Sequence, residues 1–324
     1  MSTAAESTSN ILKWANEKGE FIRKSSTFRN WVKKGDTDGF PPETDRYHLY
    51  VSYACPWAHR TLIVRKLKGL EAVVSFDVVD YLMGEKGWAF TPSKPGCTRD
   101  TVNGFSFLRE VYSLSDSNFE GRVTVPVLFD KKKKVIVNNE SSEIIRMFNS
   151  EFNECSSTSE QAALDLYPTE LRKEIDSLNE WIYTEINNGV YKAGFATKQE
   201  AYDKAVRELF AGLDKVEAIL SQRRYLTGPR LTEADVRLYT TLVRFDCVYV
   251  GHFKCNKRRI VDFPNLWGYL RDLYQTPGFG DTTDRFHIEH HYQESHTHIN
   301  PYGIVAIGPD LNFDLPHDRA TRFT

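Results

Sequence analysis

The residue whose neighbours most suggest covalent chemistry is Cys55, in the run Tyr53-Ala-Cys-Pro-Trp-Ala-His-Arg60. It follows a short alternating stretch typical of a strand and directly precedes Pro56, which is typical of the first turn of a helix. A thiol at a helix start faces unpaired backbone N–H groups and the positive end of the helix dipole, and both favour the thiolate. A fall in pKa of about two units from about 8.5 would raise the thiolate fraction at pH 7 from about 3% to about three-quarters. Cys55 is therefore the predicted nucleophile.

The spacing around Cys55 limits the mechanism. Position 58 is alanine, where a dithiol redox protein carries its second cysteine, so a mixed disulfide on Cys55 has no local thiol to resolve it. An external small thiol must do so, which points to glutathione. His59 and Arg60 lie one turn further along, where they either add positive potential or face solvent.

Two later motifs fit a glutathione site. Val125-Pro126 precedes a predicted strand, as a cis-proline does in thioredoxin-like folds, where the freed backbone pairs with the main chain of glutathione. Glu140-Ser141 stands at a predicted helix start, where N–H groups and the hydroxyl can hold the γ-glutamyl carboxylate. The Glu140 carboxylate can meet the α-amino group of the same moiety. Each motif is common, but their order after a Cys-Pro start favours glutathione binding.

The elements that must position these residues form a small domain. The periodicity predicts strands over 47–52, 72–79, 125–129 and 134–137, and helices over 56–68 and 141–149. The first strand–helix–strand unit is typical of a parallel pair with a crossover. The stretch 80–120 lacks clear periodicity and is interpreted as a long insertion. The predicted order is β-α-β-β-α.

A second domain is predicted to be all-helical. The polar stretch 151–161 is interpreted as a linker, and beyond it the apolar residues recur at helical spacing. Thr232 and Asp235 form an acidic variant of the capping box before an apolar run. The predicted organisation is an N-terminal extension (1–45), a thioredoxin-like glutathione-binding domain (46–152), an all-helical domain (162–293) and an irregular tail (294–324).

Composition restricts the function classes. The 324 residues carry a net charge of −2, which gives no electrostatic reason to expect nucleic acid or an anionic membrane as partner. The N-terminal residues lack the pattern of a secretory signal, and no apolar stretch approaches the roughly 20 residues that span a bilayer. A cytoplasmic protein is expected. The lysine run 131–134 is interpreted as the solvated tip of a hairpin.

The other possible sites are less specific. The remaining cysteines are Cys97, Cys155, Cys247 and Cys255, and an odd total without a Cys-x-x-Cys pair argues against a disulfide scaffold or structural zinc. Cys247 lies in an apolar helical run, as a packed thiol would. His287 and His291 have the spacing of a helical zinc pair, but no glutamate stands in the His-Glu-x-x-His place. No metal site is predicted.

From about residue 46 to 308 the chain resembles the glutathione transferase superfamily, and within it the Xi class, the glutathionyl-hydroquinone reductases. The Omega class shares the Cys-Pro start, whereas the Xi class is indicated by further motifs. These are Glu85-Lys-Gly-Trp88, Arg122-Val-Thr-Val-Pro-Val-Leu128, Asn138-Asn-Glu-Ser-Ser142, Leu231-Thr-Glu-Ala-Asp-Val-Arg237, Arg244-Phe-Asp-Cys-Val-Tyr-Val-Gly-His-Phe-Lys-Cys-Asn256 and Asn300-Pro-Tyr-Gly303.

The resemblance implies a fold, a reaction and residue roles. It implies a thioredoxin-like domain followed by an all-helical one, a homodimer, glutathione as co-substrate with no tightly bound cofactor, and glutathionylated hydroquinones as substrates. Cys55 is the implied nucleophile. The implied glutathione contacts are Cys55, Trp88, Arg122, Val125, Glu140 and Ser141. Tyr191 is implied as the acid that serves the aromatic substrate, and Tyr249 and Tyr292 as phenols that converge on the thiolate. The linker and the two ends differ from the family, and no role is carried over to them.

Two alternatives remain open. A broader Omega-like thioltransferase or dehydroascorbate reductase would use the same cysteine, and turnover of a glutathionyl-quinol relative to a small mixed disulfide separates the two. The superfamily fold also serves in non-catalytic binding modules, for which Cys55 would be an ordinary, slowly alkylated thiol.

Overall fold

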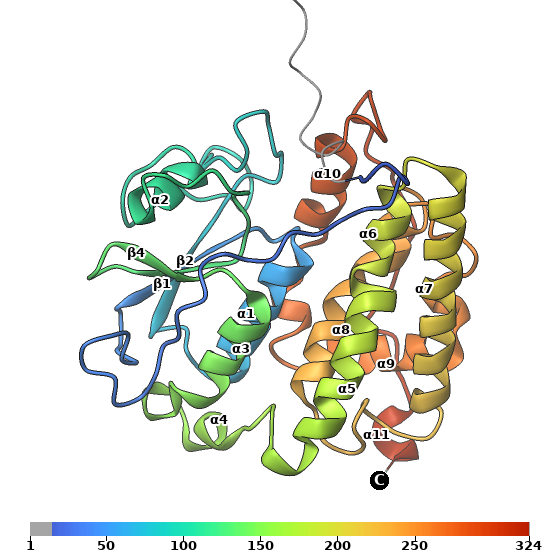
Figure 1. Cartoon of the computed structure of the whole chain (residues 1–324). Helices are drawn as coiled ribbons and strands as arrows, with labels where there is room; N and C mark the ends of the chain where they lie inside the picture. The colour runs from blue at the N-terminus through green and yellow to red at the C-terminus, as the bar shows by residue number, and fades with distance from the viewer. Residues whose placement is uncertain (1–14, 324) are drawn as a thin grey trace, which may run out of the picture.

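The structure is a computed structural model that describes residues 15–323, and it places a small sheet beside a bundle of helices (Figure 1). The sheet has the strand order β2-β1-β3-β4. Its strands are β1 (Tyr47–Val51), β2 (Val74–Val78), β3 (Val127–Asp130) and β4 (Val135–Asn138). β1 runs parallel to β2 and antiparallel to β3, so Leu49 lies between Phe76 and Leu128. All five residues of β1 are buried, as expected for a central strand covered on both faces.

Three helices accompany the sheet: α1 (Pro56–Leu67), α2 (Leu108–Ser115) and α3 (Ser141–Ser150). α1 and α3 pack against each other between the sheet and the helical bundle, whereas α2 contacts β4 (Figure 1). The predicted strands and the helices at 56–68 and 141–149 are confirmed, with bounds within two residues.

The predicted order β-α-β-β-α is wrong in one place, because it omits α2, which lies within 80–120, the stretch interpreted as a long insertion. This helix is only eight residues long. Its three buried residues, Leu108, Val111 and Tyr112, are too few to show a helical period in the sequence. Its start is capped, because the Glu110 carboxylate accepts from the Phe107 N–H at 2.8 Å. The order of the first domain is therefore β-α-β-α-β-β-α.

The regular elements beyond α3 are all helical in the part of the chain that the structure describes. Its helices are α4 (Ser159–Ala163), α5 (Arg172–Ile182), α6 (Gly189–Gly194), α7 (Gln199–Leu220), α8 (Glu233–Arg244), α9 (Pro264–Tyr274), α10 (Arg285–Ser295) and α11 (Arg319–Arg322). Short 3₁₀ turns lie at Asn153–Cys155, Thr169–Leu171, Ile260–Asp262 and Gly280–Thr282, and π-helical turns follow α5 (Tyr183–Asn187) and α8 (Phe245–Tyr249). The predicted capping box is confirmed: the Thr232 N–H donates to Asp235 at 2.9 Å. None of the helices within residues 15–323 is long and apolar enough to cross a bilayer.

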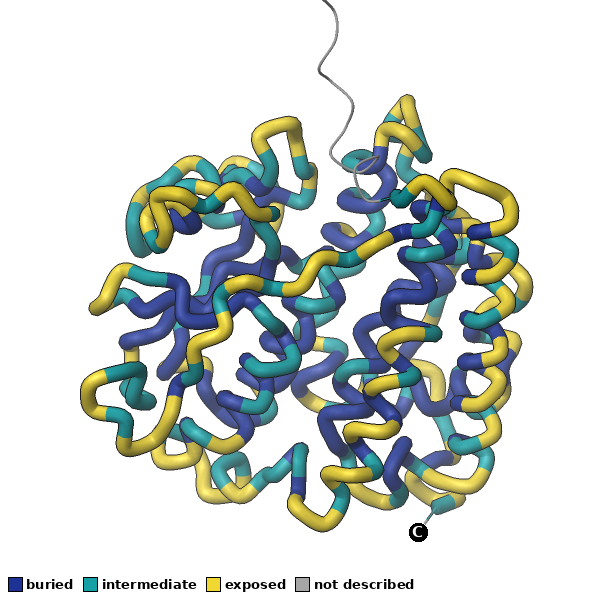
Figure 2. Tube along the Cα trace, in the orientation of Figure 1, coloured by how far each residue is buried: buried dark blue, intermediate teal, exposed yellow. Residues whose placement is uncertain are grey.

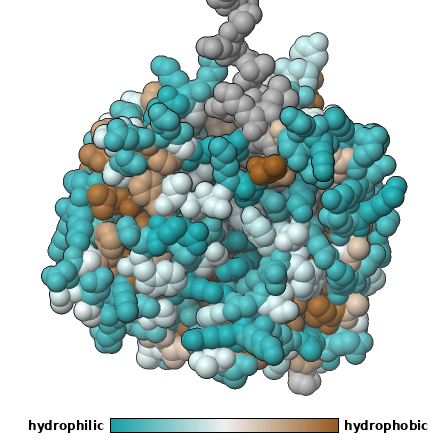
Figure 3. Space-filling model, in the orientation of Figure 1, coloured by the Kyte–Doolittle hydropathy of each residue, from teal (hydrophilic) through white to brown (hydrophobic). Residues whose placement is uncertain are grey.

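The segment 15–46 crosses the molecule from the helical domain to the sheet, mostly at the surface (Figures 1 and 2). At one end the Lys198 ammonium donates to the carbonyl of Glu17. Further along the segment, the Asn30 N–H donates to the carbonyl of Val137 in the edge strand β4 at 3.0 Å. The face that this segment crosses is mainly hydrophilic, with small separate apolar patches (Figure 3).

The tail returns along the helical domain and is mostly irregular, as predicted, apart from the short helix α11. Phe313 packs on Trp267 and Tyr274, with ring centres 5.6 and 4.7 Å apart. Arg319, at the start of α11, is 1% exposed and donates to backbone carbonyls just beyond the end of α7, including that of Arg224 at 2.7 Å. No periodic pattern predicts α11, because a four-residue helix forms only where tertiary contacts hold it.

Candidate functional site

Cys55 caps the N-terminus of α1, with Pro56 at the first helical position. Its Sγ lies 3.5 Å from the carbonyl oxygen of Val125, to which the thiol donates. The Val125–Pro126 peptide bond is cis, as the sequence predicted. The β1–α1 connection and the loop before β3, 70 residues apart in the chain, therefore meet at the thiol.

Burial raises the pKa of the half-buried Cys55 thiol. The backbone N–H groups of Ala58 and Trp57 and the guanidinium groups of Arg244 and Arg23 act in the opposite direction. The sequence-based expectation of a lowered Cys55 pKa is wrong, because it considered the helix start without the cost of removing the thiolate from water. The groups that stabilise the thiolate are nevertheless in place.

The segment before Cys55 is held by Arg244, at the end of α8, which is fully buried. Arg244 Nε and Nη2 donate to the carbonyls of Ala54 and Tyr53, each at 2.9 Å. Its Nη1 donates to Nδ1 of His59 at 3.1 Å. Burial holds the pKa of His59 well below its usual value, so the imidazole is neutral and can accept this bond. His59 thus neither adds positive potential nor faces solvent.

Three tyrosines from three different elements meet beside the thiol. Tyr191 comes from α6, Tyr249 from the π-helical turn after α8, and Tyr292 from α10. The Tyr292 hydroxyl lies 2.5 Å from that of Tyr191 and 3.0 Å from that of Tyr249. Burial raises the pKa of all three phenols, and Cys55 is close enough to raise that of Tyr191 further. The three phenols are therefore neutral proton donors at physiological pH.

Apart from Cys55, the residues predicted to contact glutathione come from three segments: the loop after β2, the loop before β3 and the start of α3. Trp88, in the long loop after β2, stacks on His291 of α10 with ring centres 5.1 Å apart. Glu140 caps α3 by accepting from the Ser142 N–H at 3.0 Å, and Ser141 is the first residue of that helix. Arg122 precedes the cis-proline, and burial lowers its pKa.

The histidines near the C-terminus attach α10 to the loop after β2. His287 Nε2 donates to the Pro95 carbonyl at 2.8 Å, and His291 Nδ1 to the Tyr81 carbonyl at 2.7 Å. Among the residues that the structure describes, no three His, Cys, Asp or Glu side chains are placed to hold a metal ion.

Two further residues at the site come from the N-terminal segment, to which the sequence assigned no role. The Ser26 hydroxyl donates to the Glu140 carboxylate at 3.1 Å. The Arg23 guanidinium lies over the rings of Trp57 and Tyr191, at 4.8 and 4.9 Å from their centres. No sequence signal singled them out, because one serine and one arginine in an irregular segment carry no period or motif.

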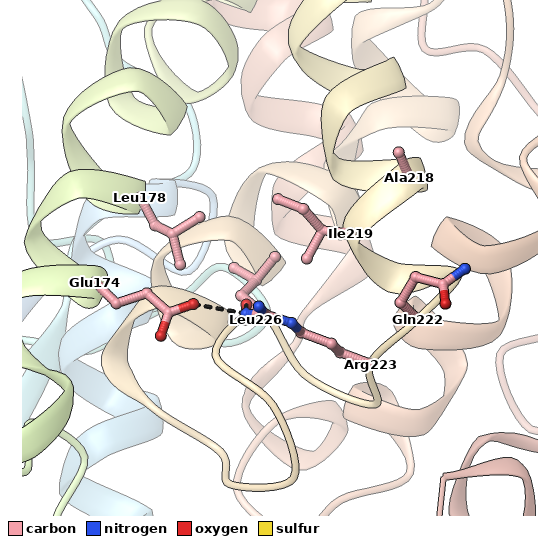
Figure 4. A pocket seen from close by; sticks show the side chains of 7 residues that line it. All are labelled: Glu174, Leu178, Ala218, Ile219, Gln222, Arg223 and Leu226. Carbon is pink, nitrogen blue, oxygen red and sulfur yellow. Dashed lines mark hydrogen bonds and ion pairs between the residues drawn. The ribbon is translucent and has the colours of Figure 1, made fainter.

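A groove between α5 and the end of α7 is separate from these residues (Figure 4). It is lined by Glu174, Leu178, Ala218, Ile219, Gln222, Arg223 and Leu226. Glu174 and Arg223 form an ion pair across it at 2.6 Å. None of the predicted catalytic or glutathione-binding residues lines this groove.

Comparisons with known proteins match this chain to glutathione S-transferases. The family model described as the glutathione S-transferase N-terminal domain matches residues 54–151, and the model of the glutathione S-transferase C-terminal domain matches residues 199–272. The chain is 57% identical to the glutathionyl-hydroquinone reductase YqjG of Escherichia coli, over 94% of each protein. It is 49% identical to the glutathionyl-hydroquinone reductase PcpF of Sphingobium chlorophenolicum, over 90% of each.

Two solved glutathione transferase structures superpose closely on this chain. The glutathione-bound structure of Escherichia coli YqjG has a TM-score of 0.88 over 92% of this chain and 97% of its own, at 57% identity. The Xi glutathione S-transferase of Phanerochaete chrysosporium has a TM-score of 0.89 over 94% and 97%, at 52% identity.

Proposed function

This chain belongs to the glutathione transferase family, in the Xi class that contains the glutathionyl-hydroquinone reductases, and from that premise we propose that it removes glutathione from glutathionyl-hydroquinones through Cys55. The observation that carries the proposal is the placement of one thiol, with Ala58 in the place of a resolving cysteine, beside three neutral phenols. The thiol suits sulfur exchange with glutathione, and the phenols suit protonation of an aromatic ring.

In the first step the Cys55 thiolate attacks the sulfur of the conjugate. A sulfur–sulfur bond forms, the bond between sulfur and the aromatic carbon breaks, and its electron pair stays on that carbon. Tyr191 supplies a proton to the carbon and recovers one through the Tyr292 hydroxyl, 2.5 Å away. The products are the free hydroquinone and a mixed disulfide between Cys55 and glutathione. The ring is reduced and the thiol is oxidised, so the electrons balance.

In the second step the thiolate of another glutathione attacks the glutathione sulfur of the mixed disulfide. Glutathione disulfide leaves, and the Cys55 thiolate is restored. The N–H groups of Trp57 and Ala58 and the charge of Arg244 stabilise this leaving thiolate. A leaving thiol of lower pKa departs faster, so the same groups assist both steps.

Glutathione binding is proposed at the residues around the thiol. The cis-proline loop offers the backbone of Val125, and the Val125 carbonyl that now accepts from the thiol would pair with the main chain of glutathione. The start of α3 at Ser141 would hold the γ-glutamyl carboxylate. Glu140 would meet the α-amino group, while Trp88 and Arg122 would contact the remainder. The resemblance also implies a homodimer, which sedimentation velocity tests.

The reaction class is tested by comparing two substrates. We expect kcat/KM with a glutathionyl-hydroquinone to exceed that with hydroxyethyl disulfide, because only the aromatic substrate uses the phenols. The assay follows the release of free hydroquinone by chromatography and of glutathione disulfide by a coupled reductase. A higher kcat/KM with the disulfide would instead favour a general thioltransferase.

Replacing Tyr191 with phenylalanine is expected to lower kcat for the glutathionyl-hydroquinone by about 100-fold, the usual contribution of a positioned proton donor. Reduction of hydroxyethyl disulfide, which needs no proton on carbon, should change little. Tyr202→Phe is the matched control, since the Tyr202 hydroxyl bonds the Lys254 carbonyl at the surface. Equal loss on both substrates would contradict the role of Tyr191 as the acid.

A further inference from the structure

Arg23 reaches the site from the N-terminal segment and is held there by aromatic faces. Its guanidinium carbon lies 4.8 Å from the ring centre of Trp57, 4.9 Å from that of Tyr191 and 5.3 Å from that of Phe21. Its Nε donates to the side-chain oxygen of Asn188 at 2.9 Å. Because a guanidinium stacks favourably on aromatic faces, the ring contacts and this hydrogen bond together fix its orientation.

One end of this guanidinium has no partner. Nη2 of Arg23 is buried and makes no hydrogen bond with the protein. A buried donor left unpaired costs free energy, and a ligand that accepts from it would recover that cost. Within residues 15–323, no carboxylate lies within ion-pair distance of Arg23.

Arg23 contributes a positive electrostatic potential on the side of the thiol. Arg23 lowers the pKa of Cys55, and its charge also lowers that of Arg122. Tyr191 beneath it is a neutral phenol, because burial raises its pKa. Two guanidinium groups that act on each other, one of them over the rings of Trp57 and Tyr191, create a positive potential that favours an anion.

We propose that Arg23 is a specificity-determining residue that receives an anionic oxygen group carried by the aromatic ring of the substrate, through its unpaired Nη2–H. This inference rests on the proposed function and names the substrate class more closely: hydroquinone conjugates with an acidic substituent. Arg23 stacks on Tyr191, the proposed acid, so a ring placed for protonation there lies beside the guanidinium. A planar carboxylate matches the fork of an arginine.

A carboxylate could also come from glutathione, so the test separates the two sources. The dissociation constants of full-length protein are measured by calorimetry for gentisate, a hydroquinone with one carboxylate, for its neutral methyl ester, and for S-methylglutathione. Wild type is compared with Arg23→Met, Arg23→Lys and the control Arg29→Met. Arg29 lies on the same segment, but its ion pair with Glu143 is at the surface.

Arg23→Met is expected to raise the dissociation constant of gentisate by about 10- to 100-fold, the effect of one charge-assisted hydrogen bond. The dissociation constants of the ester and of S-methylglutathione should stay within about twofold of the wild-type values. Arg23→Lys should restore only part of the gentisate affinity, because lysine lacks the planar fork. Arg29→Met should bind as wild type. Circular dichroism confirms that each variant is folded.

Loss of S-methylglutathione affinity alone would assign Arg23 to glutathione and overturn the proposal. Equal effects on gentisate and its ester, or no effect on either, would also overturn it. These measurements involve no turnover. Selective gentisate binding in a protein that does not release hydroquinone would therefore contradict the proposed function and leave the anion site standing.

Discussion

Cys55→Ser is expected to abolish release of hydroquinone from a glutathionyl-hydroquinone, by at least about 1000-fold in kcat, because a serine hydroxyl cannot attack sulfur and carry the mixed disulfide. The affinity for S-methylglutathione should stay within about twofold. The binding groups proposed at Val125, Glu140 and Ser141 are backbone atoms or other side chains, and the substitution only replaces the sulfur of Cys55 with an oxygen. Turnover is followed by chromatography and binding by calorimetry.

The matched control is Cys155→Ser. Cys155 lies in the short 3₁₀ turn Asn153–Cys155 between the two domains and is a free, half-buried thiol. Its variant should retain wild-type kcat. Near-normal reductase activity in Cys55→Ser, or a comparable loss in Cys155→Ser, would contradict the assignment of the nucleophile.

Arg244→Met is expected to give the second large effect, on stability and on the thiol together. The guanidinium joins α8 to the carbonyls of Tyr53 and Ala54, and its removal leaves these buried acceptors unpaired. Each unpaired group costs about 1 to 3 kcal/mol, so losing the partner of both carbonyls should lower the free energy of unfolding by about 2 to 6 kcal/mol. Urea denaturation followed by circular dichroism measures it.

The same substitution should raise the pKa of Cys55, because Arg244 is one of the charges that stabilise the thiolate. Only the thiolate is alkylated, so the rate with iodoacetamide rises with pH until the pKa is passed. Loss of a positive charge disfavours the thiolate, and the alkylation profile should shift to higher pH. The variant should therefore react more slowly than wild type below both pKa values, and equally fast above them.

Arg259→Met is the control for this pair of measurements. The Arg259 guanidinium pairs with Asp262 at 2.9 Å in an exposed position, where an ion pair contributes about 0 to 1 kcal/mol. An Arg244→Met protein as stable as Arg259→Met, with an unshifted alkylation profile, would contradict the structural role of Arg244.

Much of the fold could be predicted from local patterns, and membership of the family and its fold class are confirmed. Cys55 before Pro56 and Thr232 before Asp235 mark helix starts through side-chain chemistry that acts within a few residues. The short helix α2 could not be predicted, because its eight residues present too few apolar positions for a period. Its start depends on Glu110 and on packing against the sheet.

Local sequence patterns predict less of the candidate site than of the fold. Tyr191 and Tyr292 are 101 residues apart, and only tertiary packing brings their hydroxyls together. Their roles could therefore be predicted only from the family resemblance. The raised pKa of Cys55 depends on burial by distant elements, which a helix-start argument omits. Arg23 lies in a segment without a motif, and its importance appears only when its stacking on Trp57 and Tyr191 is seen.

The central claim is the mixed disulfide on Cys55, and intact-protein mass spectrometry tests it most directly. Protein without free glutathione is mixed with one equivalent of a glutathionyl-hydroquinone, quenched with acid and weighed, while released hydroquinone is quantified. We predict a gain of one glutathionyl group, located on Cys55 by peptide mapping, with an equal amount of free hydroquinone, and no gain in Cys55→Ser. Release of hydroquinone without this adduct, or an adduct on another cysteine, would contradict the account.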